Sequence, residues 1–257
     1  MQRSAVRPSP LFFAILAVTT AAGVLAAFVD PITQSVERDP LGTAGVFFLV
    51  IGGWALSLTL HEFGHAIVAY RGGDHSVAAK GYLSMDIRRY TDPVLSLVLP
   101  LLILAIGGIP LPGGAVWINR GMLRSRNVSS WVSLAGPLSN LALGIALTIV
   151  IAFVQMPLGL TAGLSYLASV QILAFVINIL PVPGLDGYGA IEPYLSPQAR
   201  ELGAKARPWA PLVLFAVIIG IPGVGRLLFE FTDSLFGAIG GDADFADFGR
   251  AVFMFWR

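Results

Sequence analysis

The chain has 257 residues, of which 56% are hydrophobic and only 12% are charged, and its formal net charge is +1. A soluble domain of ordinary composition carries about 25% charged residues, so this composition indicates a membrane protein. The near-neutral charge argues against a nucleic-acid partner, because no segment has the dense lysine and arginine that phosphate binding requires. No cysteine is present, which excludes disulfides and leaves only nitrogen and oxygen ligands for a metal.

Five apolar stretches are each close to the ~20 residues that a helix needs to cross a bilayer. They are residues 11–29, 41–70, 128–154, 161–180 and 210–229. The first is about as long as a full crossing, so we expect an uncleaved membrane helix rather than a signal peptide. All five are predicted to span the membrane.

A sixth apolar stretch, residues 94–109, is shorter and contains Pro100. It either crosses the membrane or enters and returns. The prolines and glycines that follow predict turns leading into a brief extended piece, residues 115–119.

Charge favours a return for this sixth stretch. If it returns, twelve of the 16 lysines and arginines lie on the side of the N-terminus, which fits the excess of positive charge on the cytoplasmic side of membrane proteins. The four on the other side are Arg38, Arg226, Arg250 and Arg257. A crossing weakens this bias. We therefore predict a re-entrant segment and a cytoplasmic N-terminus.

The motif HEFGH, which contains His61, Glu62 and His65, lies inside the second apolar stretch. Residues four apart share one face of a helix, so both histidines can bind one metal ion. Glu62 is turned about 100° away, which favours contact with a metal-bound water and the role of general base. Two buried histidines that bond neighbouring helices are the alternative. In lipid, however, ionisable groups need compensation, and one zinc ion compensates all three.

A catalytic zinc site usually has three protein ligands, so a third must come from elsewhere in the chain. His75 lies in a polar loop and is expected to be exposed. Asp186 in the sequence PVPGLDG is the better candidate, because Pro181 and Pro183 end the preceding helix and let the carboxylate turn inward. By composition alone, an ordinary interfacial turn explains this sequence equally well.

HEFGH together with NILPVPGLDG (residues 178–187) resembles the site-2 protease family of intramembrane zinc metalloproteases. The second motif of that family is N-x-x-P-x-x-x-L-D-G, and its matching positions here are Asn178, Pro181, Leu185, Asp186 and Gly187. A third element, AGPLSN (residues 135–140), resembles the G-P-x-x-N pattern that the family carries on the helix between the two metal-binding helices. The resemblance covers residues 41 to about 188 well.

The resemblance implies that His61, His65 and Asp186 bind one Zn²⁺ per chain and that Glu62 is the catalytic acid and base. It implies that the protein hydrolyses peptide bonds in or near transmembrane segments of membrane-protein substrates. Asn140 is implied to face the substrate or to orient water. Further substrate-binding or supporting positions are Gly136, Pro137, Asn178 and Pro181.

The predicted fold class is an all-α polytopic membrane protein with five spanning helices and a re-entrant segment with a short β-like piece. We expect one membrane-embedded domain over residues 1–257. Its expected parts are a core at about 41–188, flanking helices at 11–29 and 210–229, and an interfacial tail at 232–257. No polar stretch is long enough for a PDZ domain or paired CBS domains, which other family members carry.

The ligands also constrain the topology. The histidine pair and Asp186 each lie toward the C-terminal end of a helix, so the two helices must run in the same direction for the ligands to meet. This again requires that residues 94–109 do not cross. The extended piece, residues 114–119, then lies beside the site and offers an edge to which an unwound substrate segment can pair. A Val116→Pro variant is expected to reduce cleavage and to keep zinc.

The expected partners are a membrane-protein substrate, the lipid bilayer of the cell membrane and a separate regulatory protein. Two other functions are considered. A metal-ion transporter usually has inverted repeats and polar residues at several depths, whereas the ionisable groups here converge on one level. A non-catalytic relative that binds membrane proteins is the other, and the intact Glu62 argues against it.

Overall fold

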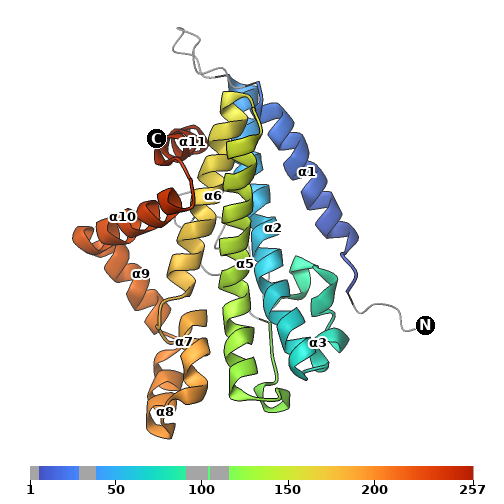
Figure 1. Ribbon diagram of the computed structural model, residues 1–257, viewed down its shortest axis with the longest axis vertical. Helices are drawn as coiled ribbons and strands as arrows, with labels where there is room; N and C mark the ends of the chain where they lie inside the picture. The colour runs from blue at the N-terminus through green and yellow to red at the C-terminus, as the bar shows by residue number, and fades with distance from the viewer. Residues whose placement is uncertain (1–5, 29–38, 91–103, 105–115, 257) are drawn as a thin grey trace.

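The structure is a computed structural model that describes residues 6–28, 39–90, 104 and 116–256. All regular secondary structure in these ranges is helical, and four long helices form a bundle (Figure 1). They are α1 (Pro10–Ala26), α2 (Pro40–Gly72), α5 (Arg126–Phe153) and α6 (Leu158–Asn178). The all-α prediction therefore holds for the described residues.

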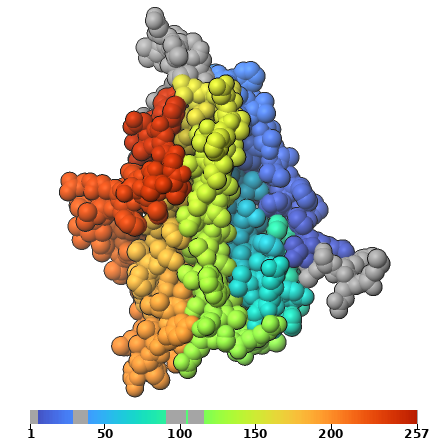
Figure 2. Space-filling view, in the orientation of Figure 1, coloured from blue at the N-terminus to red at the C-terminus, as the bar shows by residue number. Residues whose placement is uncertain are grey.

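The shorter elements surround this bundle at its ends and sides. They are α3 (Ser76–Ala79), η1 (Tyr82–Ser84), η2 (Ile87–Arg89), η4 (Arg120–Met122), α7 (Asp186–Ile191), η5 (Glu192–Tyr194), α8 (Pro197–Ala206), α9 (Ala210–Gly220), α10 (Pro222–Ala238) and α11 (Ala243–Phe253). The pair α9 and α10 projects from one side of the bundle (Figures 1 and 2).

The long helices begin where the sequence supplies caps. Ser9 and Ser125 accept hydrogen bonds from the backbone N–H groups of Phe12 and Val128, at 3.1 and 3.2 Å. Asp39 does the same for Leu41 at 3.0 Å. Because the first N–H groups of a helix have no partner inside it, each of these side chains stabilises a helix start by about 1 kcal/mol.

Helices α2 and α6 run in the same direction, and α5 runs against them (Figure 1). The start of α5 lies beside the end of α2, since the backbone N–H of Arg124 donates to the carbonyl of Gly72 at 3.1 Å. Gly72 and Arg124, which bound the connection between α2 and α5, thus lie at the same end of the bundle. This agrees with the direction that the ligand positions predicted.

The predicted re-entrant stretch, residues 94–109, lies outside the described residues except for Leu104. The extended piece is described from Val116 to Asn119 and has no regular secondary structure there. In the part of the chain that the structure describes, the expected β-like piece is therefore not a strand.

Three of the described helices, α2, α5 and α6, are long and apolar enough to cross a membrane. The count rises to four if α8 and α9, which are bent by 63°, form one broken span. Helix α1 has 17 residues and is apolar but shorter. Length and composition thus support three or four spans within the described residues, and the predicted count of five is not confirmed.

The last predicted span, residues 210–229, is two helices instead of one. Helix α9 ends at Gly220, Ile221 is extended with φ −114° and ψ 97°, and α10 begins at Pro222. A residue before proline is disfavoured in the helical conformation, and proline itself is well tolerated at a helix start. The local sequence therefore breaks a stretch whose composition is uniformly apolar.

The predicted tail, residues 232–257, contributes to the core. Its helix α11 packs against α6 and α2. Phe253 is fully buried and stacks on Phe47 of α2, with ring centroids 5.3 Å apart. Trp256 stays 44% exposed, and the interfacial position expected for the tail stays a prediction.

One end of the bundle is strongly basic. The N-terminal segment lies at this end, because the Arg7 N–H donates to the Leu83 carbonyl at 3.3 Å and the Ser9 hydroxyl to the Met85 carbonyl at 3.4 Å. The basic residues on the described elements there are Arg7, Arg71, Lys80, Arg88, Arg89, Arg120, Arg124, Arg126, Arg200, Lys205 and Arg207. Eleven of the twelve positive charges that the sequence assigned to one side are in the described residues, and these eleven share one end of the molecule.

Candidate metal centre

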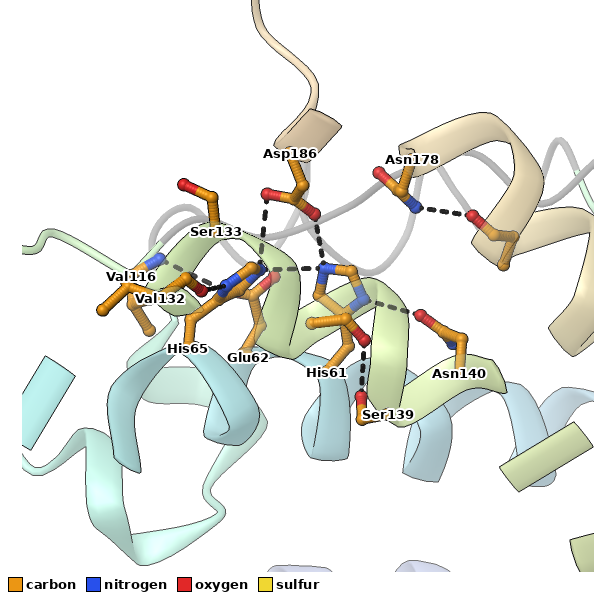
Figure 3. Close-up of polar contacts among 12 residues, drawn as sticks. His61, Glu62, His65, Val116, Val132, Ser133, Ser139, Asn140, Asn178 and Asp186 are labelled. Carbon is orange, nitrogen blue, oxygen red and sulfur yellow. Dashed lines mark hydrogen bonds and ion pairs between the residues drawn. The ribbon is translucent and has the colours of Figure 1, made fainter. Parts of the chain in front are cut away.

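Three potential metal ligands from two elements meet near the basic end of the bundle (Figure 3). The Nε2 atoms of His61 and His65 on α2 lie 3.1 Å apart. Asp186 places Oδ2 3.2 Å from the Nε2 of His61 and Oδ1 3.4 Å from the Nε2 of His65. The structure thus brings together the three residues that the sequence singled out, and their ligand atoms lie within 4.8 Å of one another.

The loop between α6 and α7 delivers Asp186 to the histidines. Helix α6 ends at Asn178, and the chain turns at Gly184, whose φ of +101° favours glycine. Leu185 is buried and anchors the loop, and its N–H donates to the Val182 carbonyl at 2.9 Å. Asp186 then begins α7 with its carboxylate directed at α2 (Figure 3).

Both histidine rings are oriented by carbonyl oxygens. The Nδ1 of His65 lies 2.6 Å from the main-chain oxygen of Val132, and the Nδ1 of His61 lies 2.6 Å from Oδ1 of Asn140. These oxygens only accept hydrogen bonds, so each Nδ1 carries a hydrogen and donates it. In the neutral ring the lone pair is then on Nε2, directed toward Asp186.

This arrangement fits a divalent metal. Two nitrogen lone pairs and one carboxylate converge on a common point, and a cation there satisfies all three at once. Two histidines and one carboxylate form a donor set that catalytic zinc uses, and a carbonyl that accepts from the outer nitrogen is the usual second partner of a metal-binding histidine. His61, His65 and Asp186 are therefore suited to hold zinc.

Gly136 of the AGPLSN motif lies directly against the two imidazoles. A Cβ atom built on this residue would lie 2.3 Å from the Nε2 of His65 and 2.5 Å from the Nε2 of His61. Any side chain here would occupy the space where the ligands converge. The small residue Gly136 thus lets α5 pack closely against the two histidines. Asn140, one helical turn later on α5, contacts the His61 ring.

Glu62 lies beside the cluster and not in it. It is buried, and its Oε2 accepts a hydrogen bond from the backbone N–H of Val116 at 3.2 Å. Glu62, the three potential ligands and Val116 to Ile118 all line a cavity of about 520 Å³. The carboxylate therefore faces a space that is large enough for a short peptide segment.

Asn140 lies behind His61 and does not face the cavity. It is only 2% exposed, and its Nδ2 donates to Oγ of Ser57 at 2.8 Å and to Oε1 of Gln171 at 2.9 Å. Ser57 also donates a hydrogen bond to Gln171. The expected substrate-facing position of Asn140 is therefore corrected to one that orients the His61 ring. Sequence reasoning missed Ser57 and Gln171, although a polar residue in an apolar span is itself a signal.

The segment Val116–Asn119 is fastened beside Glu62 by the loop after α2. Asp74, which is fully buried, accepts from the N–H of Asn119 at 2.6 Å, and Lys80 donates to the Trp117 carbonyl at 2.8 Å. Burial acts to raise the pKa of Asp74, but hydrogen bonds from Ser76 and Asn119 lower it below its usual value. Sequence reasoning did not identify Asp74.

The other predicted residues lie at different distances from the centre. His75 is exposed as expected, and its ring contacts Tyr70. Asn178 is buried, donates to the Ala174 carbonyl at 3.0 Å and lines the cavity. Pro137 is buried inside α5, and Pro181 is exposed in the loop after α6. Of these, only Asn178 shares the cavity with the potential ligands.

Comparison with known proteins agrees with the motifs. A protein of Mycolicibacterium smegmatis named "Putative zinc metalloprotease Rip2" is 42% identical over 99% of this chain and 96% of its own length. This chain belongs to the site-2 protease family. A second site-2 protease with the same printed name, from Mycobacterium tuberculosis, is 44% identical over the same shares of the two chains.

A more distant member of the site-2 protease family comes from Bacillus subtilis. It is named "Putative zinc metalloprotease YwhC" and is 30% identical over 64% of this chain and 77% of its own length. No family model and no solved structure matched the chain. The names of the relatives support a metalloprotease role that uses zinc.

Proposed function

We propose that this site-2 protease is an intramembrane zinc metalloprotease that cleaves membrane-protein substrates in or near their transmembrane segments, as in regulated intramembrane proteolysis. The observation that carries the proposal is the convergence of His61, His65 and Asp186 beside Glu62 in one cavity. The histidines and Glu62 belong to a helix that is long and apolar enough to cross a membrane. The basic end of the bundle, with the N-terminus, then faces the cytoplasm of the cell.

His61, His65 and Asp186 are the residues that would hold one zinc ion per chain. When bound, zinc polarises a peptide carbonyl and makes water more acidic. The Val116 N–H holds Oε2 of Glu62 and leaves Oε1 to accept a proton from the attacking water. The water oxygen bonds to the carbonyl carbon, the C–N bond breaks, and Glu62 returns the proton to the leaving amine.

A substrate helix must unwind locally before this reaction, because its carbonyls are committed to hydrogen bonds within the helix. The segment Val116–Ile118 lines the same cavity, so its main chain is positioned to pair with an unwound substrate strand. The Val116→Pro test is ambiguous, because the substitution also removes the hydrogen bond to Glu62. An Ile118→Pro variant removes an N–H group that has no such role and is expected to reduce cleavage while zinc content stays the same.

The function is tested with Glu62→Ala. Fragments of membrane proteins are compared in cells that carry the wild type or the variant, and zinc per chain is measured on both purified proteins. We expect the variant to lose cleavage and to retain zinc, whereas His61→Ala loses both. A fragment pattern that is identical in wild type and Glu62→Ala would contradict proteolysis and favour a scaffold. Zinc flux into vesicles that does not depend on Glu62 would favour a transporter.

A further inference from the structure

A second cavity of about 440 Å³ lies next to the catalytic one, at the basic end of the bundle. Four arginines line it, namely Arg120, Arg126, Arg200 and Arg207, and Glu192 is the one acidic residue of its lining. We call this cavity the arginine pocket. Its lining therefore has an excess of positive charge.

The arginine pocket already binds one carboxylate from the protein itself. Glu192 accepts two hydrogen bonds from Nη2 of Arg207, both 3.1 Å long, and its Oε2 lies 3.4 Å from Nη1 of Arg120. Arg126 and Arg200 have neither a hydrogen bond nor an ion pair from their guanidinium groups to any described residue. Two arginines of the pocket are thus available for another anion.

The arginine pocket adjoins the catalytic cavity and shares two lining residues with it. Arg120 and Arg207 line both spaces. Nη2 of Arg120 also donates to Oγ of Ser133, a residue of the catalytic cavity, at 3.3 Å. A polypeptide that occupies the catalytic cavity can therefore extend directly into the arginine pocket.

We propose that the arginine pocket binds an acidic side chain on the part of the substrate that flanks the scissile bond. This proposal rests on the proposed proteolytic function. A carboxylate between Arg126 and Arg200 repeats the chemistry seen at Glu192, because guanidinium groups bind carboxylates through paired hydrogen bonds. A peptide fits better than a lipid, since among the described residues of the lining Leu123 and Pro193 are the apolar ones, and the arginines match the carboxylates of a peptide.

The test uses two transmembrane peptides that are identical except for their cytoplasmic flank, which carries Asp and Glu in one and Asn and Gln in the other. The zinc-loaded wild type in neutral phosphatidylcholine vesicles is expected to cleave the acidic peptide with a roughly tenfold higher kcat/KM, the effect of two partly exposed ion pairs. In the double variant Arg126→Gln and Arg200→Gln the ratio should fall to about one. The preference should also weaken at high salt.

Lys205→Gln is the matched control, because it removes a positive charge at the same end of the molecule but outside the arginine pocket, where Lys205 pairs with Glu201. It should keep the preference. Equal kcat/KM for the two peptides with the wild type would overturn the proposal. So would a double variant whose only effect appears in vesicles that contain phosphatidylglycerol, because that result assigns the pocket to lipid.

A binding measurement tests the arginine pocket independently of the proposed proteolytic function. The Glu62→Ala protein is titrated with both fluorescent peptides, and tighter binding of the acidic one supports the arginine pocket whether or not cleavage occurs. If neither peptide is cleaved by the wild type but the binding preference is present, the proteolytic function fails and the pocket stands. Equal binding of both peptides refutes the pocket alone.

Discussion

The two sides of the catalytic cavity are positioned by different kinds of contact. The proposed metal ligands are held inside the bundle, where Asn140 and Gln171 are at most 2% exposed and bond to one another. The segment Val116–Asn119 is held at the end of the bundle by a loop, through Asp74 and Lys80. One side depends on helix packing and the other on a few hydrogen bonds from the loop after α2, in which Asp74 is buried.

The difference predicts different consequences of mutation. A polar group left without a partner in the bundle interior costs about 1–3 kcal/mol, because no water can replace the lost bond. Of the contacts that hold the segment, the one from Lys80 is exposed, so water can replace it, whereas Asp74 is buried. Neither residue bonds to His61, His65 or Asp186. Changes on the interior side should therefore affect zinc binding and stability, and changes on the segment side should affect turnover.

The largest effect is expected for Gly136→Ala. The new Cβ would lie within 2.5 Å of both Nε2 atoms, so α5 and the histidines cannot keep their positions. We expect almost complete loss of zinc and of activity, measured as zinc per chain and peptide cleavage. Gly237→Ala in α10 is the control, since no heavy atom lies within 4 Å of its added Cβ. Zinc at one per chain in the Gly136 variant would show that the interior is not closely packed.

The second largest effect is expected for Asn140→Leu, which tests the interior side of the cavity. It removes the acceptor for His61 Nδ1, and loss of such a partner typically lowers metal affinity about 10- to 100-fold. Gln171→Leu should have a smaller effect in the same direction, because Gln171 acts through Asn140. Competition with a zinc chelator gives the affinities. Ser139→Ala, which loses only a bond within α5, should match the wild type.

Asp74→Asn tests the other side of the cavity. An asparagine side chain has one acceptor oxygen, so it cannot accept from both the Asn119 N–H and the Ser76 N–H, which bond to different carboxylate oxygens, and the segment is less firmly placed against Glu62. We expect kcat to fall by roughly tenfold, a modest case of misplaced catalytic geometry, with no change in zinc affinity. Faster hydrogen exchange at the Asn119 amide should accompany the loss. A variant that loses zinc instead would break the distinction between the two sides.

The smallest effect concerns stability in acid. The hydrogen bond from Arg88 lowers the pKa of Asp86 below its unfolded value of about 3.9. The carboxylate therefore contributes stability that is complete above that value and is lost as the pH falls through the lower folded value. Thermal unfolding followed from pH 6 to pH 3 should show a shallower decline for Asp86→Asn. An unchanged slope would mean that this loop does not contribute.

Much of this architecture was predictable, because it depends on local sequence. The stretches predicted at residues 128–154 and 161–180 are α5, Arg126–Phe153, and α6, Leu158–Asn178. Their apolar length determines them, and for α5 the capping residue Ser125 also marks the start. The break before Pro222 was equally local but was hidden by the apolar composition around it.

The missed contacts have a different origin. Asp74 and Asn119 are 45 positions apart, and Asn140 and Gln171 are 31 apart, so no local pattern marks them as partners. The motif located Asn140, but which way its side chain points depends on how α5 crosses α2. Sequence alone therefore identified the candidate ligands and Glu62 better than it identified the residues that hold them in position.

The two histidine rings of the proposed metal site differ in how a mutation can change their orientation. His61 relies on the side chain of residue 140, so a single codon change can remove its partner. His65 relies on the main-chain oxygen of residue 132, which every amino acid supplies. Substitutions at residue 140 can therefore change how the His61 ring is oriented. No substitution at residue 132 removes the oxygen that orients His65, so that contact persists as long as the fold does.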